Sequence, residues 1–507
     1  MDPVRHNEGG VDEAPPFPIT VRDAAFMESR FAMSSLGSPI VDRRAFLLAG
    51  AGAAAAGLLP RSGRAEAPCA EYNLTAASAQ SPILGASRPW TEVWSYNGSI
   101  PGPEIRVRQG EPVRINVRNG LSEETTVHWH GIRLPNNMDG VPGLTQRPIA
   151  PGETFTYKFT PPDAGTFWYH SHSNSLQQLG RGLTGPLIVE EAERYPVDRD
   201  LVWMFADWRL TTDAQIASGF GNAMEAAMSG RVGNTVTVNG AISSGEQVHA
   251  GERIRLRLIN GALARIMALR FEGHRPVIIA VDGQPCQPHQ PPNGRLLLGP
   301  AMRIDIVLNL RGKPGHHYAV RDDFYEDLAY TVTHLNYSAN AALRTARDDN
   351  DVPLPGNPLP EPDLQGAEPH QIVLQGGMMG GGMMHGMGGM SGMAHDASWS
   401  INGHSMIGDG QASMPSLLTL PRGRSIILKM QNKTAWWHPM HLHGYSFKLL
   451  RRNGTPVPHR QWGDTVLMAP KDNVDVAFVA DNPGKWMLHC HITDHQVSGM
   501  MSVLDVR

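Results

Sequence analysis

The sequence predicts an all-β protein made of three consecutive antiparallel β-sandwich domains of Greek-key type. Short segments such as "PVRINV", "RIRLRL" and "SIILKM" alternate apolar and polar residues, which is typical of half-buried strands. Glycine (54 residues) and proline (40 residues) are abundant, as in proteins rich in turns, and long helical periodicity is absent from the sequence. An internal repeat sets the number of domains at three.

The repeat consists of Asn-Gly, a glycine turn, an alternating strand and a closing asparagine. It occurs in "YNGSIPGPEIRVRQGEPVRINVRNG", "VNGAISSGEQVHAGERIRLRLINGA" and "INGHSMIGDGQASMPSLLTLPRGRSIILKMQNKT". The turn glycine and the closing asparagine are nine residues apart in all three copies, at Gly110–Asn119, Gly251–Asn260 and Gly423–Asn432. This repeat predicts domains at about 68–192, 193–350 and 366–507, with a proline-rich linker at 351–365.

Residues 1–67 are predicted to be an N-terminal extension and an export signal. Arg43 and Arg44 precede an apolar run that ends at Leu59 and is too short to span a bilayer comfortably. Paired arginines before such a run resemble the bacterial twin-arginine (Tat) signal. We therefore expect export by the Tat machinery to the periplasm, without a stable membrane anchor. Whether translation starts at Met1 or Met33, and where the signal is cleaved, stays open.

The composition argues against other classes of protein. A net charge of -4 gives no reason to expect a nucleic-acid partner. The three cysteines, Cys69, Cys286 and Cys490, are too few for a disulfide scaffold, although a Cys69–Cys286 bridge stays open. We expect a monomer.

Histidines follow the first and third copies of the repeat in the same register. Nine and eleven residues after the closing asparagine, these copies carry His128 and His130, and His441 and His443. The middle copy has Leu269 and Phe271 at those positions. On this composition, histidine at two predetermined positions arises by chance with a probability of about 0.002.

Two further histidine pairs end the same two domains. "GTFWYHSH" carries His170 and His172, "GKWMLHCH" carries His489 and His491, and the middle "GHHYAVRD" carries Val320 and Asp322 instead. Residues i and i+2 of a strand point to one face, so each pair presents two imidazoles to the same side. Eight imidazoles converging between the first and third domains could hold about three metal ions, and imidazole suits copper, zinc, iron or nickel.

The end of the chain indicates copper. Cys490 lies between two histidines and is followed by His495 and Met500, while "WWHPMHLHG" supplies His438. One cysteine, two histidines and a distant methionine are the ligand set of a blue-copper site. Because adjacent strand residues face opposite sides, the histidines that flank Cys490 would reach other metal ions. A buried core thiol with two incidental histidines is the alternative.

The motifs "HWHG", "HSH", "HPMHLHG" and "HCHITDH" followed by Met500 resemble the four copper-binding motifs of the multicopper oxidases, the laccase-like family that includes copper-efflux cuprous oxidases. The resemblance spans nearly the whole chain after the signal and implies three cupredoxin-like Greek-key β-sandwich domains with four copper ions. It implies a type 1 copper at His438, Cys490, His495 and Met500, a type 2 copper at His128 and His441, and a type 3 pair at His130, His170, His172, His443, His489 and His491.

The resemblance also implies the reaction. A reducing substrate gives single electrons to type 1 copper, and they pass through Cys490 to the trinuclear cluster, where O₂ is reduced to water. Asp139, in "LPNNMDG", resembles the family's acid beside the cluster and is, with Cys490, a candidate catalytic residue. An ordinary Asp-Gly turn is the alternative. Gln496 stands where copper-efflux members often carry glutamate, and an amide cannot relay a proton as an acid does, so whether the family's second proton route exists here stays open.

A methionine-rich insertion suggests the substrate. Residues 376–393 read "GGMMGGGMMHGMGGMSGM", in which seven residues are methionine and nine are glycine. Soft thioethers select Cu(I), and a flexible linker without chemistry is the alternative. We interpret the chain as a periplasmic oxidase of Cu(I) that contributes to copper tolerance; oxidation of phenols or of Mn(II) stays possible. A copper store is disfavoured because it would not need a type 1 site joined to a cluster, and a copper-free scaffold is disfavoured because all the ligand residues are present.

Overall fold

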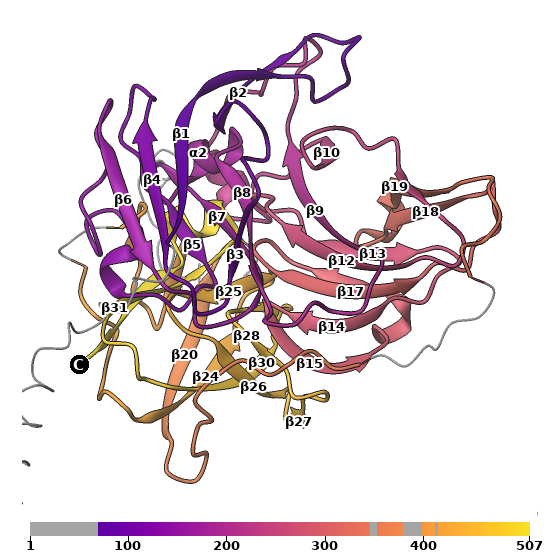
Figure 1. Ribbon diagram of the computed structural model, residues 1–507. Coiled ribbons are helices and arrows are strands. Elements are labelled where there is room, and N and C mark those ends of the chain that lie inside the picture. Colours follow the sequence, from indigo (N-terminus) through magenta and orange to yellow (C-terminus); the bar gives the residue numbers. More distant parts are fainter. Residues whose placement is uncertain (1–68, 345–351, 379–397, 411–413) are drawn as a thin grey trace, which may run out of the picture. The chain divides into compact units, whose positions relative to one another are not determined.

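The computed structural model describes residues 69–344, 352–378, 398–410 and 414–507 (Figure 1). These residues belong to the second of two compact units, Glu66–Arg507. The predicted signal at 1–67 and residues 379–393 of the methionine-rich insertion lie outside the described residues.

The predicted all-β class is confirmed, because strands in three successive pairs of sheets make up the fold. Helices within the described ranges are short: α2 (Ser175–Gly180), α3 (Ala223–Ala226), α4 (Thr493–Val497) and the 3-10 helices η2 (Asn136–Met138), η3 (Pro292–Gly294) and η4 (Glu326–Leu328). No helix in this part of the chain has the length and apolar character that crossing a membrane requires.

The first domain pairs a sheet in the order β2-β1-β4-β6 with a sheet in the order β3-β8-β7-β5. The strands of the first sheet are β2 (Thr91–Tyr96), β1 (Ala70–Ser81), β4 (Val113–Asn119) and β6 (Thr154–Phe159). Those of the second are β3 (Ile105–Arg108), β8 (Thr184–Glu190), β7 (Gly165–His170) and β5 (His128–His130).

The middle domain has the same plan, but its two sheets contain more strands, in the orders β10-β9-β12-β17-β14-β15 and β11-β19-β18-β13-β16. The first contains β10 (Thr235–Val238), β9 (Arg199–Trp208), β12 (Arg253–Asn260), β17 (Arg303–Asn309), β14 (Val277–Val281) and β15 (Gln284–His289). The second contains β11 (Glu246–Val248), β19 (Tyr330–Tyr337), β18 (His317–Asp322), β13 (Met267–Phe271) and β16 (Leu296–Leu298).

The third domain repeats the plan again, with sheets ordered β21-β20-β24-β30-β26-β27 and β23-β33-β31-β25-β29. The first contains β21 (Trp399–Ile401), β20 (Glu368–Gly376), β24 (Ser425–Asn432), β30 (Asn473–Val479), β26 (Phe447–Arg452) and β27 (Thr455–Pro456), with β28 (Trp462–Gly463) also pairing with β26. The second contains β23 (Leu418–Leu420), β33 (Met501–Val506), β31 (Gly484–Cys490), β25 (His438–Leu442) and β29 (Thr465–Met468); β22 (Met406–Ile407) and β32 (Ser498–Gly499) form a small separate ribbon.

The expectation of purely antiparallel sandwiches is wrong in one respect. Each of the six large sheets contains one parallel pair: β1/β4, β3/β8, β9/β12, β11/β19, β20/β24 and β23/β33. A parallel pair needs a long crossover between its strands, and here the chain makes it by visiting the opposite sheet. Alternation of apolar residues reports burial and not strand direction, so the sequence pattern could not reveal these pairs.

The closing asparagine of the repeat has one structural role in all three domains. The Asn119 side-chain oxygen accepts from the Leu121 amide at 2.9 Å, and its amide nitrogen donates to two backbone carbonyls at 2.7 and 2.8 Å. Asn260 and Asn432 make the same three bonds. This buried asparagine therefore supplies hydrogen-bond partners for backbone amide and carbonyl groups at the point where the chain passes from one sheet to the other.

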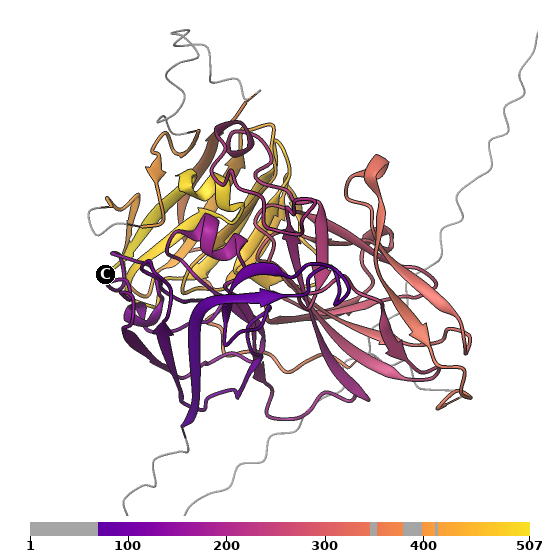
Figure 2. The same ribbon diagram turned by 90° about the horizontal axis from the view of Figure 1, so that it is seen from above.

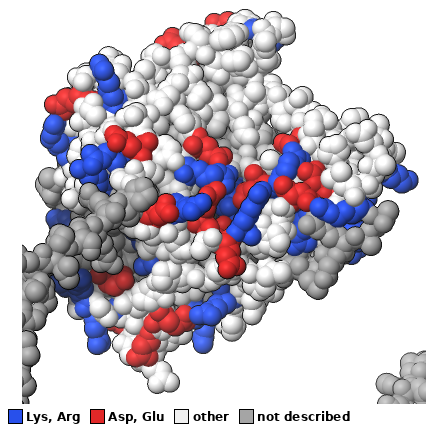
Figure 3. Space-filling view, viewed as in Figure 1, with Lys and Arg blue, Asp and Glu red and all other residues white. Residues whose placement is uncertain are grey.

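The first and third domains share apolar packing, which places their histidine-bearing sheets together. The largest buried apolar cluster includes Val127 and Trp129 of the first domain and Met440 and Trp486 of the third, whereas most of the middle domain's core forms a separate cluster. In Figure 2 the purple strands of the first domain lie beside the yellow strands of the third. On the face shown in Figure 3, acidic and basic side chains are interspersed. Cys69 and Cys286 are both free, so the bridge left open by the sequence is absent.

Candidate copper centres

The Cys490 site is formed by the end of β31, the start of β25 and helix α4. The Cys490 Sγ atom lies 3.6 Å from the Nδ1 atoms of His438 and His495, and these two Nδ1 atoms are 3.1 Å apart. All three side chains are fully buried. The outer Nε2 atoms are engaged at 2.8 Å, that of His438 with Thr434 Oγ1 and that of His495 with the Met228 carbonyl. His495 must donate to this carbonyl, so its Nδ1 lone pair faces Cys490.

Burial keeps these groups neutral in the absence of a cation. Desolvation raises the pKa of the Cys490 thiol and lowers the pKa of His495 to about 3. Neutral imidazole is the form that binds a metal ion, and a bound cation would deprotonate the thiol. Met500 is fully buried. Two backbone hydrogen bonds place it beside this site: its amide donates to the His495 carbonyl at 2.9 Å, and its carbonyl accepts from the Cys490 amide at 3.0 Å.

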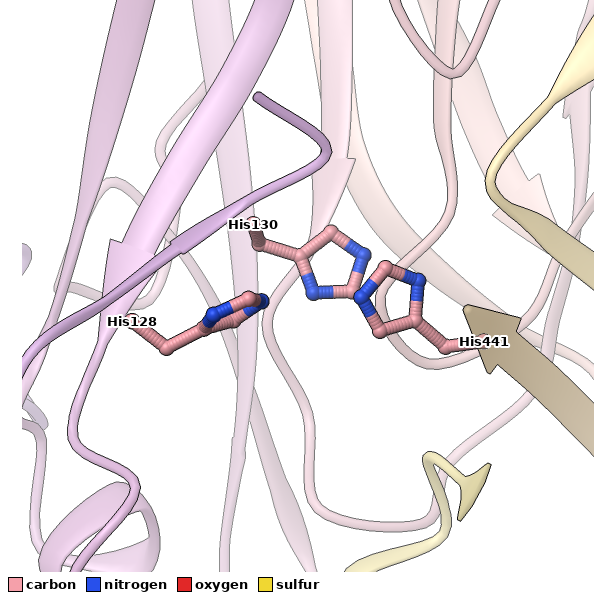
Figure 4. Close-up of side chains that lie close together, drawn as sticks. All are labelled: His128, His130 and His441. Carbon is pink, nitrogen blue, oxygen red and sulfur yellow. The ribbon is translucent and has the colours of Figure 1, made fainter. Parts of the chain in front are cut away.

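The eight paired histidines form three groups whose nitrogen atoms lie within 4.8 Å of one another, and the first two groups share His130. The groups are His128, His130 and His441; His130, His170 and His491; and His172, His443 and His489. Every group combines residues of the first and third domains. Figure 4 shows the first group, with His128 and His130 from one domain facing His441 from the other. The middle domain supplies none of these histidines, as the sequence register predicted.

The strand register explains why the histidines converge. His128 pairs directly with His170 across β5 and β7, and His441 pairs with His489 across β25 and β31. In the middle domain Leu269 pairs with Asp322, which is two residues beyond the position equivalent to His170. Because side chains alternate along a strand, a shift of the pairing register by two residues leaves each side chain on the same face of the sheet. The middle domain therefore keeps the fold although it lacks the histidine site.

The comparisons with known proteins agree with this geometry. Family models described as multicopper oxidase match residues 79–194, 199–343 and 389–507. The chain belongs to the multicopper oxidase family. It is 29% identical to multicopper oxidase MmcO of Mycobacterium tuberculosis over 95% of each protein, and 30% identical to Laccase-1 of Botryotinia fuckeliana, covering 82% of this chain and 78% of that protein. The crystal structure of a multi-copper oxidase from Pseudomonas thermotolerans superposes with a TM-score of 0.78 and 34% identity, covering 87% of this chain and all of that one.

As a multicopper oxidase, the protein is a copper-dependent oxidoreductase with cupredoxin-like domains that uses O₂ and a reducing substrate. Its donor atoms fit copper. The Nε2 atoms of His443 and His489 face each other at 3.0 Å, and those of His170 and His491 at 3.4 Å, as two ligands of one ion would. The Nε2 atoms of His128 and His441 are buried and have no hydrogen-bond partner among the described residues. Such orphaned acceptors are costly unless a cation occupies the space between them.

Asp139 lies beside this copper centre, just after η2. Its carboxylate oxygens are 2.9 Å from His443 Nδ1 and 3.2 Å from His128 Nδ1, and the side chain is 1% exposed. The residue also begins the turn that the sequence suggested, because Gly140 follows it with φ of 85°. An acid with only a turn-forming role would not need to be buried against two imidazoles, so the position supports the predicted role beside the cluster.

Gln496 follows His495 within α4. Its side-chain nitrogen is buried and has no hydrogen-bond partner among the described residues. An amide cannot exchange a proton as a carboxylic acid does, so this position offers no acid for a second proton route.

Several residues that hold the ligands were missed by the sequence analysis. Asp464 immediately precedes β29. Its backbone carbonyl accepts from His441 Nδ1 at 2.9 Å, and its carboxylate lies 3.2 Å from His130 Nε2. Burial alone would raise the pKa of Asp464, but the adjacent Arg303 guanidinium holds it below the ordinary value. Thr434 and the Met228 carbonyl orient His438 and His495 in the same way. No motif marks these residues: Asp464 and Met228 are 334 and 267 residues from His130 and His495, and Thr434, four residues before His438, has no distinctive pattern around it.

Proposed function

We propose that this multicopper oxidase is a periplasmic cuprous oxidase, which oxidises Cu(I) to Cu(II), reduces O₂ to water and so contributes to copper tolerance. The protein holds four copper ions: type 1 at His438, Cys490, His495 and Met500; type 2 at His128 and His441; and a type 3 pair at His130, His170, His172, His443, His489 and His491. When bound, copper supplies one-electron redox chemistry and the reduction of O₂.

The chain joins the two kinds of site by a short covalent path. Cys490 faces His438 and His495, while the adjacent His489 and His491 face the eight-histidine centre. Asp139 touches His128 and His443 and is the acid that we expect to move protons at that centre.

The choice of substrate rests on how the type 1 histidines are covered: Trp399 and helix α3 form a cover over His438 and His495. Both imidazoles are fully buried and their outer nitrogens are engaged, so no ring edge is open to a bulky organic reductant. Trp399 packs over the His495 ring at 4.3 Å and donates through Nε1 to the Ala226 carbonyl of α3 at 2.6 Å. A small ion that is captured at the surface of this cover is a better electron donor for such a site than a phenol that must contact the ring.

The surface of the cover carries thioethers. Met224 of α3 is 64% exposed and Met378 is 38% exposed. Met378 is held there, because its amide donates to the Ala227 carbonyl at 2.8 Å and its carbonyl accepts from Trp436 Nε1 at 2.9 Å. The methionine-rich insertion continues from Met378, and soft thioethers prefer Cu(I). The predicted twin-arginine signal supports the periplasmic location.

Removal of the methionine-rich residues tests this proposal. Strands β20 and β21 pair at Gly376 and Trp399, and the Gly377 amide donates to the Ser398 carbonyl at 2.9 Å, so the chain on both sides of the insertion is closely held. Residues 379–393 can therefore be replaced by a short Gly-Ser turn without disturbing Met378. We expect the variant to oxidise Cu(I) several-fold more slowly at limiting Cu(I), while oxidation of a small phenol is retained.

The control replaces the same residues by a Gly-Ser segment of equal length, which removes the thioethers but not the chain. Both variants are assayed at full copper loading, so loss of copper cannot imitate the effect. Equal loss of Cu(I) and phenol oxidation would assign the segment to folding. Unchanged Cu(I) kinetics in both variants would remove the support for Cu(I) and favour a laccase-like phenol oxidase or an Mn(II) oxidase.

A further inference from the structure

The middle domain contributes no histidine to the copper centres, yet one of its arginines reaches them. Arg303, the first residue of β17, has a fully buried side chain. Its guanidinium forms two parallel bonds with the Asp464 carboxylate of the third domain, at 2.9 Å and 2.5 Å. The same group donates through Nε to the Thr166 carbonyl of the first domain at 3.1 Å. A single side chain thus bonds to both copper-bearing domains.

The Arg303 backbone is held equally firmly within its own domain. Its amide donates to Asp282 Oδ1 at 2.9 Å, and Asp282 Oδ2 accepts from the Thr465 amide of the third domain at 3.1 Å. The guanidinium therefore occupies a defined position at the meeting point of the three domains.

Asp464 transmits this position to the histidines. Its Oδ1 atom lies 3.2 Å from both His130 Nε2 and His441 Nδ1. A carboxylate that is paired with an arginine only accepts hydrogen bonds, so His130 Nε2 must donate to it, while His441 Nδ1 donates to the Asp464 carbonyl at 2.9 Å. This leaves the lone pairs on His130 Nδ1 and His441 Nε2, which are two buried nitrogens without a hydrogen-bond partner among the described residues. Asp464, held in place by Arg303, thereby selects which nitrogen of each ring is free for copper, through its carboxylate for His130 and through its carbonyl for His441.

The backbone next to His130 is shaped to admit the arginine. Gly131 follows it with φ of +86°, and a Cβ atom there would lie 2.3 Å from Arg303 Nη2 and 2.6 Å from Asp464 Oδ2. Any larger residue would displace the ion pair from its position beside the histidines.

We propose that Arg303 is a positioning residue for the trinuclear copper centre, through which the ligand-free middle domain sets the tautomer and orientation of His130 and His441. This inference rests on the copper assignment proposed above and not on the identity of the reducing substrate. A ligand that loses such an outer partner binds its metal more weakly and in altered geometry.

The test compares Arg303→Lys with Arg255→Lys. Lysine keeps the buried positive charge, so no carboxylate is left without a counter-charge, but it cannot make the two parallel bonds and also reach Thr166. Arg255 is the matched control. It is 1% exposed and pairs with Asp305 and Glu191, and within the described part of the chain neither carboxylate bonds to a copper-site histidine.

Copper content and the type 2 electron paramagnetic resonance signal are measured on the purified holoenzymes, together with the type 1 absorption. For Arg303→Lys we expect full type 1 absorption, an altered type 2 spectrum and about 10- to 100-fold weaker retention of trinuclear copper against a chelator. Arg255→Lys should match the wild type in all three. Arg303→Met is not used, because it leaves the buried Asp464 without a counter-charge and would confound loss of copper with misfolding.

An Arg303→Lys enzyme with wild-type type 2 spectrum and copper retention would overturn the proposal, as would equal copper loss in Arg255→Lys. Neither readout depends on the substrate. An enzyme that prefers phenols over Cu(I) could still show the expected copper loss, so failure of the proposed function and failure of this inference are distinguishable.

Discussion

At the scale of single residues, the copper centres depend on which nitrogen of each imidazole faces inward. His495 and His130 donate through Nε2, to a carbonyl and to Asp464, and offer Nδ1. His441 instead donates through Nδ1 and offers Nε2. The motifs predicted which residues converge, because strand periodicity fixes the face of a side chain. They could not predict the donor atoms, since these depend on partners that are distant in sequence, such as Asp464, 334 residues from His130.

Cys490→Ser tests the assignment of the type 1 site. Serine nearly preserves the volume but removes the thiolate, so we expect the blue absorption and O₂ consumption to be lost. Copper at the eight-histidine centre should remain, because no histidine changes. The measurement is the visible spectrum together with copper atoms per chain.

Cys286→Ser is the matched control for this prediction. Cys286 is also buried, and burial raises its pKa to about 12, but its sulfur has only His289 nearby, at 3.9 Å, among the hydrogen-bonding groups of the described residues. The control should keep the blue colour. A blue Cys490→Ser protein, or a colourless Cys286→Ser protein, would contradict the assignment.

At the scale of structural elements, the repeat found in the sequence is also the repeat of the fold. The Asn-Gly pairs at 97–98, 239–240 and 402–403 all have positive φ at both residues, and a later strand of each domain (β4, β12 or β24) ends at the equivalent buried asparagine. These features were predictable because turn chemistry and alternation are local. The two-residue offset of Leu269 and Asp322 was not, since an equal sequence spacing fixes no cross-strand register.

Asn260→Ala tests the importance of the closing asparagine. The change leaves the Ala262 amide and the Arg265 and Leu298 carbonyls without their side-chain partner in a buried region. We expect a loss of about 2–4 kcal/mol in the free energy of unfolding, from unsatisfied buried backbone groups. The urea midpoint of the middle domain's transition reports this loss.

Asn473→Ala serves as the control, because Asn473 is exposed at the start of β30. It should change stability by less than about 0.5 kcal/mol. Equal stability of Asn260→Ala and wild type would show that the shared geometry of the three asparagines does not stabilise the fold.

At the scale of the whole molecule, function arises between domains. The first and third domains supply the histidines that we propose as copper ligands, and the middle domain supplies Arg303 and the Met228 carbonyl, which contact the residues around them. The sequence predicted the outer pairing because the middle repeat lacks histidines. It gave no sign of the middle domain's contribution, since an arginine in an alternating strand such as "RIDIVLN" looks like an ordinary surface residue.

The central claim, that Cu(I) is the electron donor, is tested most directly by O₂ uptake of the mature, copper-loaded enzyme with Cu(I), a phenol and Mn(II) side by side. The account predicts the highest kcat/KM with Cu(I), and four Cu(I) ions oxidised for each O₂ that is reduced to two water molecules, without release of peroxide. A higher kcat/KM with the phenol or with Mn(II), or no Cu(I)-dependent uptake above the uncatalysed rate, would contradict it.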